Sequence, residues 1–330
     1  MKQTSAAGFT HRWALVFIAL LAVAGAIYWY LEKPRIATRA KSLNPVSRGI
    51  KVRVMTFNVN MIEPTAGADR WHIQRRLLPK ILDLCKPDLI GFQACTPVQA
   101  AWLADHLRNY RHYPVPRGLA GGIFSAISGA ISTWNQIFYS TRFSRIAAAH
   151  GLVRPGDLQN DATENAYYSL VVLHDRGGTL PDIILLDTHL RHGNLNAAVD
   201  AGLLHVIMHQ WQRKFPGALS IVLGDMNHTR TDIPVYSRLI GPAAHVADDD
   251  RWSDTFDYKL RPKNRAWGTV QYYVGRPGLT WPSDLIFVGP GWSWTPAKII
   301  RFHGRHGNYP SDHFPVCTVL TPTRKAAARP

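Results

Sequence analysis

The stretch LSIVLGDMN, residues 219–227, decides the fold of this chain. It begins with a run rich in Leu, Ile and Val, which is typical of a strand buried on both faces of a sheet. Asp225 and Asn227 follow at the point where this strand ends. Side chains at strand ends can converge with those of neighbouring strands over the edge of a sheet. The stretch therefore predicts a layered α/β structure with functional side chains at one edge.

Four other predicted strands carry polar residues at their boundaries. They are KVRVMTFN, DIILLDTHL, DLIFV and FPVCTVL, with Asn58, His189, Asp284 and the pair Asp312 and His313 at those positions. Carboxylates hold Mg²⁺ or Mn²⁺, His and Asn donate hydrogen bonds to phosphate, and a His beside a carboxylate can take a proton from water. Each feature alone is more often structural than catalytic. Together they favour a site for a metal ion and a phosphate group.

Further elements fill the chain between these motifs. Apolar residues at helical spacing predict three helices, at about 69–85, 96–107 and 194–215. Short apolar runs predict strands at 88–93, 134–139 and 168–174. Many buried strands with a few long helices indicate sheets stacked face to face, with helices outside, over about residues 50–321.

The composition excludes several classes of protein. The chain has 330 residues, 46% of them hydrophobic and 18% charged, which excludes an intrinsically disordered chain. Its 25 Gly and 22 Pro are aperiodic, which excludes a collagen-like protein. The three cysteines, Cys85, Cys95 and Cys317, match no zinc pattern and argue against a disulfide framework. One bridge with one free thiol stays open.

The motifs TFNVN, DLIGFQA, DTHL, GDMN, SDLIFV and SDHFP, in this order, carry a specific resemblance. The chain resembles the endonuclease/exonuclease/phosphatase superfamily, which includes pancreatic deoxyribonuclease, AP endonucleases, neutral sphingomyelinases and inositol-phosphate phosphatases. The resemblance covers essentially all of the chain after a linker. It implies a four-layer α-β-β-α sandwich of two mixed sheets.

The resemblance also implies metal and phosphate contacts. Asn58 and Asp312 correspond to residues beside the metal ion, which would be Mg²⁺ or Mn²⁺. Asn58, His189 and Asn227 correspond to residues that bind the phosphate. A His in the DTHL motif is more similar to the deoxyribonuclease and sphingomyelinase branches than to the AP endonucleases.

The catalytic roles implied by the resemblance fall on five residues. Asp225 and Asn227 would orient the attacking water. His313, held by Asp284, would act as the base or stabilise charge, and His189 would assist the leaving group. These five residues are the expected catalytic set.

Two positions depart from the family pattern. The family's metal-binding Glu follows the Gln of the second motif, but here the chain has Ala94, which offers no ligand atom. The chain is therefore either a naturally degenerate member or one in which the Glu has been replaced. Gln93 is neutral and is expected on the other face of the strand, and Glu63 is better explained as a solvated loop residue. At Pro282 and Ser283 the family's usual Arg is missing.

The N-terminal part contains a candidate membrane anchor. WALVFIALLAVAGAIYWYL, residues 13–31, has no charge and has aromatic residues near both ends. We expect an uncleaved anchor, with a cleaved signal peptide as the alternative. The count of flanking Lys and Arg favours a cytoplasmic domain, whereas the charged N-terminal region favours export, and we expect export. The expected segments are a tail (1–12), the anchor (13–31), a linker (32–49), the domain (50–321) and a tail (322–330).

The charge balance bears on the substrate. The formal net charge of +16 suits a polyanion such as nucleic acid, or an anionic membrane surface. The first hypothesis is a metal-dependent phosphodiesterase, a nuclease that cuts DNA or RNA without strong sequence specificity and is impaired by Ala94. The alternatives are a lipid or inositol phosphodiesterase and a non-catalytic member that binds polyanions.

Overall fold

The computed structural model describes residues 50–60, 68–113, 134–153, 166–241, 251–261 and 266–323. The predicted anchor at residues 13–31 and Glu63 lie outside these ranges. Within them, no helix combines the length and the apolar character needed to cross a membrane. All described residues lie in the unit Ser42–Pro330.

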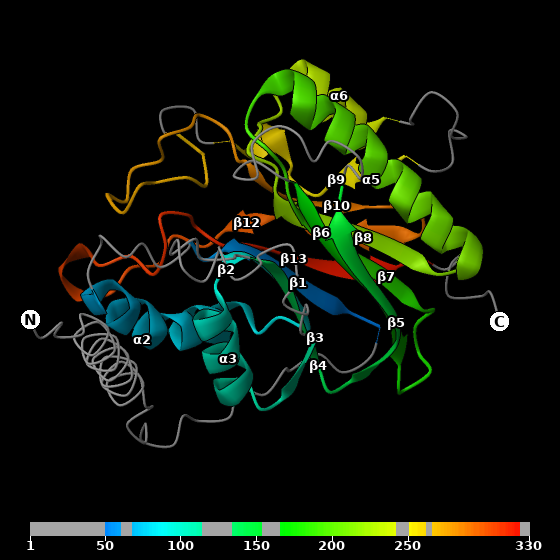
Figure 1. Ribbon diagram of the computed structural model, residues 1–330, viewed down its shortest axis with the longest axis horizontal. Coiled ribbons are helices and arrows are strands. Elements are labelled where there is room, and N and C mark those ends of the chain that lie inside the picture. Colours follow the sequence, from blue (N-terminus) through cyan, green and yellow to red (C-terminus); the bar gives the residue numbers. More distant parts are fainter. Residues whose placement is uncertain are drawn as a thin grey trace, which may run out of the picture. The chain divides into compact units, whose positions relative to one another are not determined.

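The first of two mixed sheets is built around the first strand of the domain (Figure 1). Its strands, in spatial order, are β11 (Trp292–Trp294), β13 (Val316–Pro322), β1 (Val52–Asn58), β2 (Leu89–Cys95), β4 (Trp134–Ser140) and β3 (Tyr110–Tyr113), with β12 (Lys298–Ile299) also on β13. The β1–β2 pair is parallel and the other pairs are antiparallel.

The second sheet contains the strand formed by LSIVLGD, residues 219–225. Its strands, in spatial order, are β5 (Phe143–Leu152), β6 (Tyr167–Asp175), β7 (Ile183–His189), β8 (Leu219–Asp225), β10 (Asp284–Val288) and β9 (Ser253–Asp254). β7 and β8 are parallel, and β10 is antiparallel to β8. β7, β8 and β10 are almost wholly buried, as their continuous apolar runs predict.

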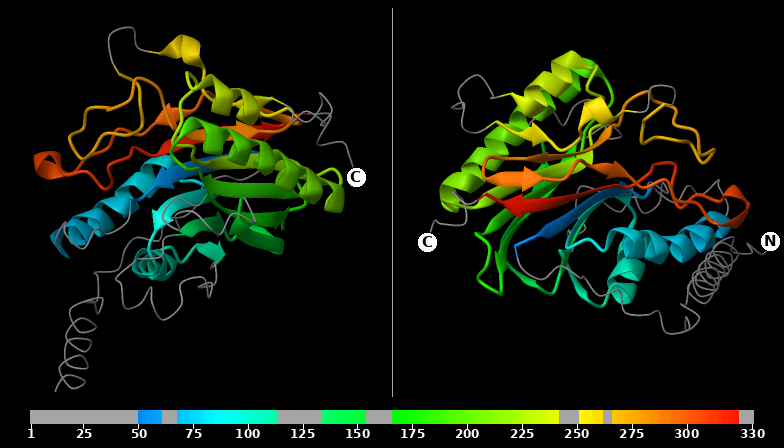
Figure 2. Two further views of the ribbon diagram at one scale, coloured as in Figure 1. Left: turned by 45° about the horizontal axis from the view of Figure 1, so that its top comes forward. Right: turned by 180° about the vertical axis from the view of Figure 1, so that it is seen from behind.

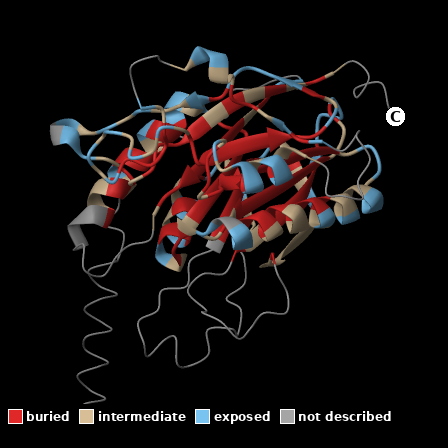
Figure 3. Cartoon of the chain, turned by 90° about the horizontal axis from the view of Figure 1, so that it is seen from above, coloured by how far each residue is buried: buried red, intermediate tan, exposed pale blue. Residues whose placement is uncertain are grey.

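Helices cover the outer faces of the two sheets (Figure 2). α2 (Ala68–Cys85) and α3 (Pro97–His106) pack on the first sheet through residues such as Leu78 and Leu103, which meet Phe57 and Phe92. α5 (Asn194–Lys214) and α6 (Ile233–Ile240) pack on the second sheet. Two short 3-10 helices, η3 (Tyr258–Leu260) and η4 (Arg305–Gly307), lie in connections. Buried residues are concentrated in the strands between the helices (Figure 3).

The two sheets are in close contact at Gly91 of β2. A Cβ atom at this position would lie 2.1 Å from Cδ1 of Leu223 and 2.8 Å from Cγ of Asp187, both in the second sheet. Only a residue without a side chain fits, so the first sheet rests directly on the second here. This contact sets the distance between the strands whose ends carry the functional residues.

The predicted fold class is confirmed: the chain forms two mixed sheets with helices outside. The helix predicted from Thr96 is present, with a capping box between Thr96 and Gln99. Among the described residues, eight elements are not predicted from the sequence: the strands β3, β5, β9, β11 and β12, the helix α6, and the 3-10 helices η3 and η4. β5 is an edge strand whose middle residues are exposed or half-buried, so it lacks the apolar pattern that marks a strand.

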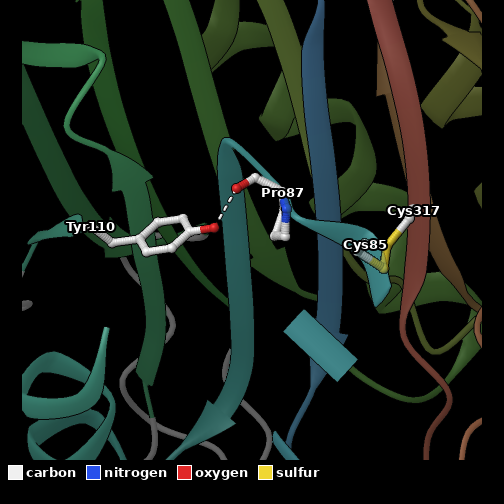
Figure 4. The surroundings of a disulfide bond; sticks show 4 residues. All are labelled: Cys85, Pro87, Tyr110 and Cys317. Carbon is white, nitrogen blue, oxygen red and sulfur yellow. Dashed lines mark hydrogen bonds between the residues drawn. A yellow bond between two sulfur atoms is a disulfide. The ribbon is translucent and has the colours of Figure 1, made fainter. Parts of the chain in front are cut away.

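A disulfide joins the helix layer to the first sheet (Figure 4). It links Cys85, the last residue of α2, to Cys317 of β13, across a sequence separation of 232 residues. Beside it the hydroxyl of Tyr110 donates a hydrogen bond to the carbonyl of Pro87, at 2.5 Å. Cys95 is free and buried. The alternative of one bridge and one free thiol is therefore the arrangement present.

Candidate functional site

The polar residues predicted at strand ends lie at one edge of the paired sheets. In the second sheet, His189 at the end of β7 is paired with Asp225 at the end of β8, which is paired with Asp284 at the start of β10. In the first sheet, Asn58 ends β1. The antiparallel partner of β1, β13, is preceded by His313. Strand order and direction therefore bring together residues that are up to 255 positions apart, from 58 to 313.

Asp225 is at the centre of this group. Its Oδ2 accepts a hydrogen bond from Nδ2 of Asn58 at 2.8 Å, and its Oδ1 accepts one from the backbone N–H of Asn227 at 2.9 Å. Nε2 of His189 lies 3.5 Å from Oδ2, and Nδ1 of His313 lies 3.8 Å from it. Although burial opposes ionisation, His313 and His189 hold the pKa of Asp225 below its usual value. Asp225 is therefore a fixed anion in contact with both sheets.

His313 and Asp284 form a buried pair. Nδ1 of His313 lies 2.9 Å from Oδ2 of Asp284, and the backbone N–H of Asp284 donates to the hydroxyl of Thr269. Burial alone would lower the pKa of His313, but Asp284 and Asp225 outweigh it and raise the pKa to about 10. Because Nδ1 is held by Asp284, Nε2 is the atom left to face a ligand.

His189 is the more exposed of the two histidines. Its side chain is 29% accessible, against 9% for that of His313. Burial, and repulsion from His313, outweigh the attraction of Asp225 and lower the pKa of His189. The two histidines are thus tuned in opposite directions: His313 is held as a cation and His189 favours the neutral form.

Asp312 and Asn227 contact this group at its edge. Oδ1 of Asp312 lies 4.0 Å from Nε2 of His313 and accepts a hydrogen bond from the hydroxyl of Ser311. Nδ2 of Asn227 donates to the carbonyl of Leu190 at 2.6 Å, which orients its amide. Asn227 has a φ of 52°, in the left-handed region that Asn tolerates well. Both residues are beside Asp225 or His313.

The end of β2 lies beside Asn58. Gln93 is paired in register with Asn58, but its amide is buried and donates to Thr56 and to Asp187, at 3.0 and 2.6 Å. Gln93 therefore points away from the site, as expected. Ala94 comes next, at a β-bulge, with a φ of 51° and a half-exposed side chain. This is the position where the resemblance places a metal-binding Glu.

Two places bear on the binding of a divalent ion: the position of Ala94, and the group formed by Asp225, Asp284 and His313. Ala94 offers no ligand atom, and a hard divalent ion needs several oxygen ligands. Asp225, Asp284 and His313 offer three ligand atoms within 4.8 Å of one another. Oδ1 of Asp284 is buried without a hydrogen-bond partner. This Asp-Asp-His group can hold a metal ion only when His313 is neutral, and its nitrogen ligand is one that Mg²⁺ disfavours.

Three supporting residues were missed in the sequence. Ser311 donates to the carbonyl of Asn58 and accepts from the backbone N–H of His313, and Gln271 donates from its backbone to the carbonyl of Asp312. Thr269 holds Asp284 through the hydroxyl described above. Ser311 lies inside the SDHFP motif and could have been found there. Thr269 and Gln271 lie in a connection with no periodic pattern, so no feature of the sequence marks them.

Comparison with protein families identifies the fold that carries this arrangement. The family model described as "Endonuclease/Exonuclease/phosphatase family" matches residues 55–313. The chain belongs to this family. The match includes all the strand ends described above. Comparison with curated proteins finds no match.

Solved structures share the fold at low sequence identity. A mannosyl-6-phosphatase from Bacteroides thetaiotaomicron is 18% identical, with a TM-score of 0.66, over 82% of this chain and 99% of that one. A family protein from the same organism is 17% identical, with a TM-score of 0.65, over 84% and 100%. TDP2 from D. rerio, solved with a single-strand DNA product, is 14% identical, with a TM-score of 0.59, over 82% and 99%. At these identities the likeness concerns the fold.

Family membership fixes the coarse chemistry. The domain has a phosphodiesterase and phosphatase fold, which indicates hydrolase-type activity on phosphate esters. Members of the family generally depend on divalent metal ions. The structural neighbours differ in their ligands. One is named as a mannosyl-6-phosphatase, and another was solved with a single-strand DNA product.

Proposed function

We propose that this protein binds phosphodiester polyanions, nucleic acid foremost, at the Asp225–His313 edge, and that it is a phosphodiesterase whose hydrolysis is impaired by Ala94. The observation that carries the proposal is the fixed contact of Asp225 with Asn58 from the other sheet, beside the His313–Asp284 pair. Such a fixed set of donors and one anion suits a phosphate group and a water molecule.

The roles of the residues follow from their charge state. His313 is a cation at neutral pH and presents Nε2, so it would donate to a phosphate oxygen and offset its charge. Asp225 is an anion held by two donors, so it would orient a water molecule for attack. His189, partly exposed and 3.5 Å from Asp225, would donate to the phosphate or the leaving group. None of these roles requires a group that the chain lacks.

The impairment follows from the donor set beside Ala94. Family chemistry relies on a divalent ion, which offsets negative charge as it develops on the phosphoryl oxygens. Ala94 stands at the position of the family's Glu and offers no ligand atom, so the ion would lack that anionic ligand. Binding and positioning of the phosphate are therefore retained, and hydrolysis is expected to be slow.

The charge of the chain suits a nucleic acid ligand. The net charge of +16 supplies many cationic groups for a phosphate backbone. No motif for reading bases is present, so binding should be largely independent of sequence. The same charge would attract anionic headgroups, which makes lipid binding the competing outcome of the test.

The test is a binding assay with the chain as it exists. We expect it to bind two unrelated duplex DNAs of equal length with equal affinity, and the affinity to fall steeply between 50 and 200 mM salt. His189→Ala should weaken binding several-fold. The control is His174→Ala, because His174 is exposed, pairs with Asp182 and lies at the opposite end of β6 from the site. Binding without salt dependence, or a clear preference for anionic vesicles, would contradict the proposal.

A further inference from the structure

Two arginines lie on aromatic rings next to the site. Cζ of Arg230 is 4.1 Å from the centre of the Tyr258 ring and 5.3 Å from that of Trp281. Cζ of Arg261 is 4.1 Å from the centre of the same Trp281 ring. We call these four residues, Arg230, Tyr258, Arg261 and Trp281, the arginine platform. A guanidinium stacked on a ring keeps its N–H groups available at its edge.

The platform continues the strand pair that carries the catalytic carboxylates. Asp225 of β8 is paired with Asp284 of β10, and one step outward the N–H of Met226 donates to the carbonyl of Ser283, at 2.9 Å. Arg230 follows Met226 by four residues, and Trp281 precedes Ser283 by two. The contact between Arg230 and Trp281 shows that the segment after β8 and the segment before β10 remain side by side beyond the site. Arg230 and Trp281 of the platform therefore lie on the two segments that adjoin Asp225 and Asp284 in the chain.

The guanidinium groups are not used for internal pairing. Among the described residues, the side chains of Arg230 and Arg261 make no hydrogen bond and no ion pair, and Nε of Arg261 is buried without a partner. The carboxyl group of Asp254, close to Arg230, instead accepts hydrogen bonds from the hydroxyls of Tyr236 and Tyr258. Two fixed cations with free donors form a site that suits an anion.

We infer that the arginine platform binds a second phosphate group of the substrate, next to the phosphate held at Asp225 and His313. This inference rests on the proposed function and adds the requirement that the substrate carries at least two phosphates. The ring faces fix both guanidiniums before binding, so little side-chain entropy is lost. The platform also supplies cationic donors near Pro282 and Ser283, where the usual Arg of the family is missing.

The test compares two single-stranded DNA octamers in EDTA, one native and one in which the phosphates flanking the central one are neutral methylphosphonates. We expect the full chain to bind the native octamer roughly tenfold more tightly. Arg230→Gln with Arg261→Gln should remove this difference and reduce the slope of log affinity against log salt by about 1.4, for two lost contacts. The comparison of octamers on the unchanged chain needs no variant, so it stands even if the double variant folds poorly.

The matched control removes two cations elsewhere. Arg213 and Lys214 are exposed at the end of α5, and Lys214 also lies over a ring, that of Trp211. Arg213→Gln with Lys214→Gln should leave the preference for the native octamer intact. A second experiment uses a sugar bisphosphate as the ligand of the Arg230→Gln, Arg261→Gln variant. If this variant loses affinity for the octamer alone, the second phosphate belongs to a nucleic acid strand. If it loses affinity for both ligands, the platform binds the second phosphate of either kind of ligand.

The outcomes separate this inference from the proposed function. If the platform variant binds the native octamer as tightly as the unchanged chain, the platform is not a phosphate subsite and the proposed function stands. Equal binding of the two octamers by the unchanged chain overturns the inference in the same way. If the unchanged chain binds neither octamer, both the inference and the proposed function are wrong.

Discussion

Asp225 links the two sheets through a single carboxylate. Its Oδ2 accepts from Asn58 of the first sheet, and its backbone is in the second sheet. A buried anion is tolerated only when it is paired or hydrogen-bonded, and here Asn58, Asn227 and the nearby His313 stabilise it. The residue that we propose positions the ligand therefore also joins the two sheets at the site.

At this scale we predict the effect of Asp284→Asn. The amide cannot hold His313 as a cation, so hydrolysis measured in an Ala94→Glu background should fall by about 10²-fold or more, mainly in kcat. The matched control is Asp182→Asn, because Asp182 makes an Asp–His pair with His174 at the same 2.9 Å, far from the site and exposed. Equal loss in both variants, or no loss in Asp284→Asn, would contradict the assigned role.

Residue-level prediction from the sequence was uneven for a physical reason. Residues at strand ends, such as Asp225 and His189, were found because strand boundaries are marked by a change from apolar to polar. Asp187 has the same sequence context, but the structure buries it between the sheets, where it accepts a hydrogen bond from Gln93. Burial there raises the pKa of Asp187 well above its usual value. The alternation of faces along a strand decides between these outcomes. It becomes visible only when the register is known.

At the scale of elements, the contact of the two sheets at Gly91 is the most sensitive to change. Gly91→Ala would place a Cβ 2.1 Å from Leu223, and we expect it to lower the free energy of unfolding by about 1–3 kcal/mol. The control is Gly177→Ala in an exposed turn, where the nearest atom would be 3.7 Å away. Urea unfolding of both variants measures the difference. A stability of Gly91→Ala equal to that of the control would show that the sheets can separate at little cost.

The sequence predicts the strands that are continuous apolar runs and the helices that have a clear start signal, and it does not predict elements that lack these features. β7, β8 and β10 are continuous apolar runs, and α3 has a Thr-Pro start. β5 was missed because only one of its edges is paired and its residues are small or polar, so nothing in its sequence requires burial. Tertiary pairing with β6 makes it a strand.

At the scale of the whole molecule, the disulfide between α2 and β13 closes most of the domain into one loop. Replacing Cys85 and Cys317 by Ser should lower the free energy of unfolding by about 2–5 kcal/mol, because the unfolded chain gains freedom. Thermal unfolding with and without reductant measures this. Reductant should destabilise the unchanged chain and leave the double variant unaffected. An equal effect of reductant on both proteins would contradict this prediction, because the double variant has no bridge between Cys85 and Cys317 to reduce.

The same bridge is consistent with our proposal that the domain is exported. Disulfides persist in oxidising compartments and are rare in the cytosol. We expect Cys85 and Cys317 to be found oxidised when cells are treated with an alkylating agent and the protein is analysed without reduction. Fully alkylated cysteines in the native host would place the domain in a reducing compartment.

The central claim is that the chain keeps a phosphodiesterase site and lacks one carboxylate at position 94. Ala94 already has a φ of 51°, so Glu at this position meets no new backbone restriction, and the residue is only half-buried. A Glu would add an anionic ligand on a rigid strand end, and about 4 kcal/mol of transition-state stabilisation corresponds to about a thousandfold in rate. The stability of the domain should change little.

The direct measurement is the rate of hydrolysis of plasmid DNA and of a chromogenic phosphodiester by the unchanged chain and by Ala94→Glu, with Mg²⁺, with Mn²⁺ and with EDTA. We predict near-zero activity of the unchanged chain and a metal-dependent activity of Ala94→Glu that EDTA abolishes. Equal, EDTA-sensitive activity of the two proteins would contradict the account and would require another ligand for the metal ion.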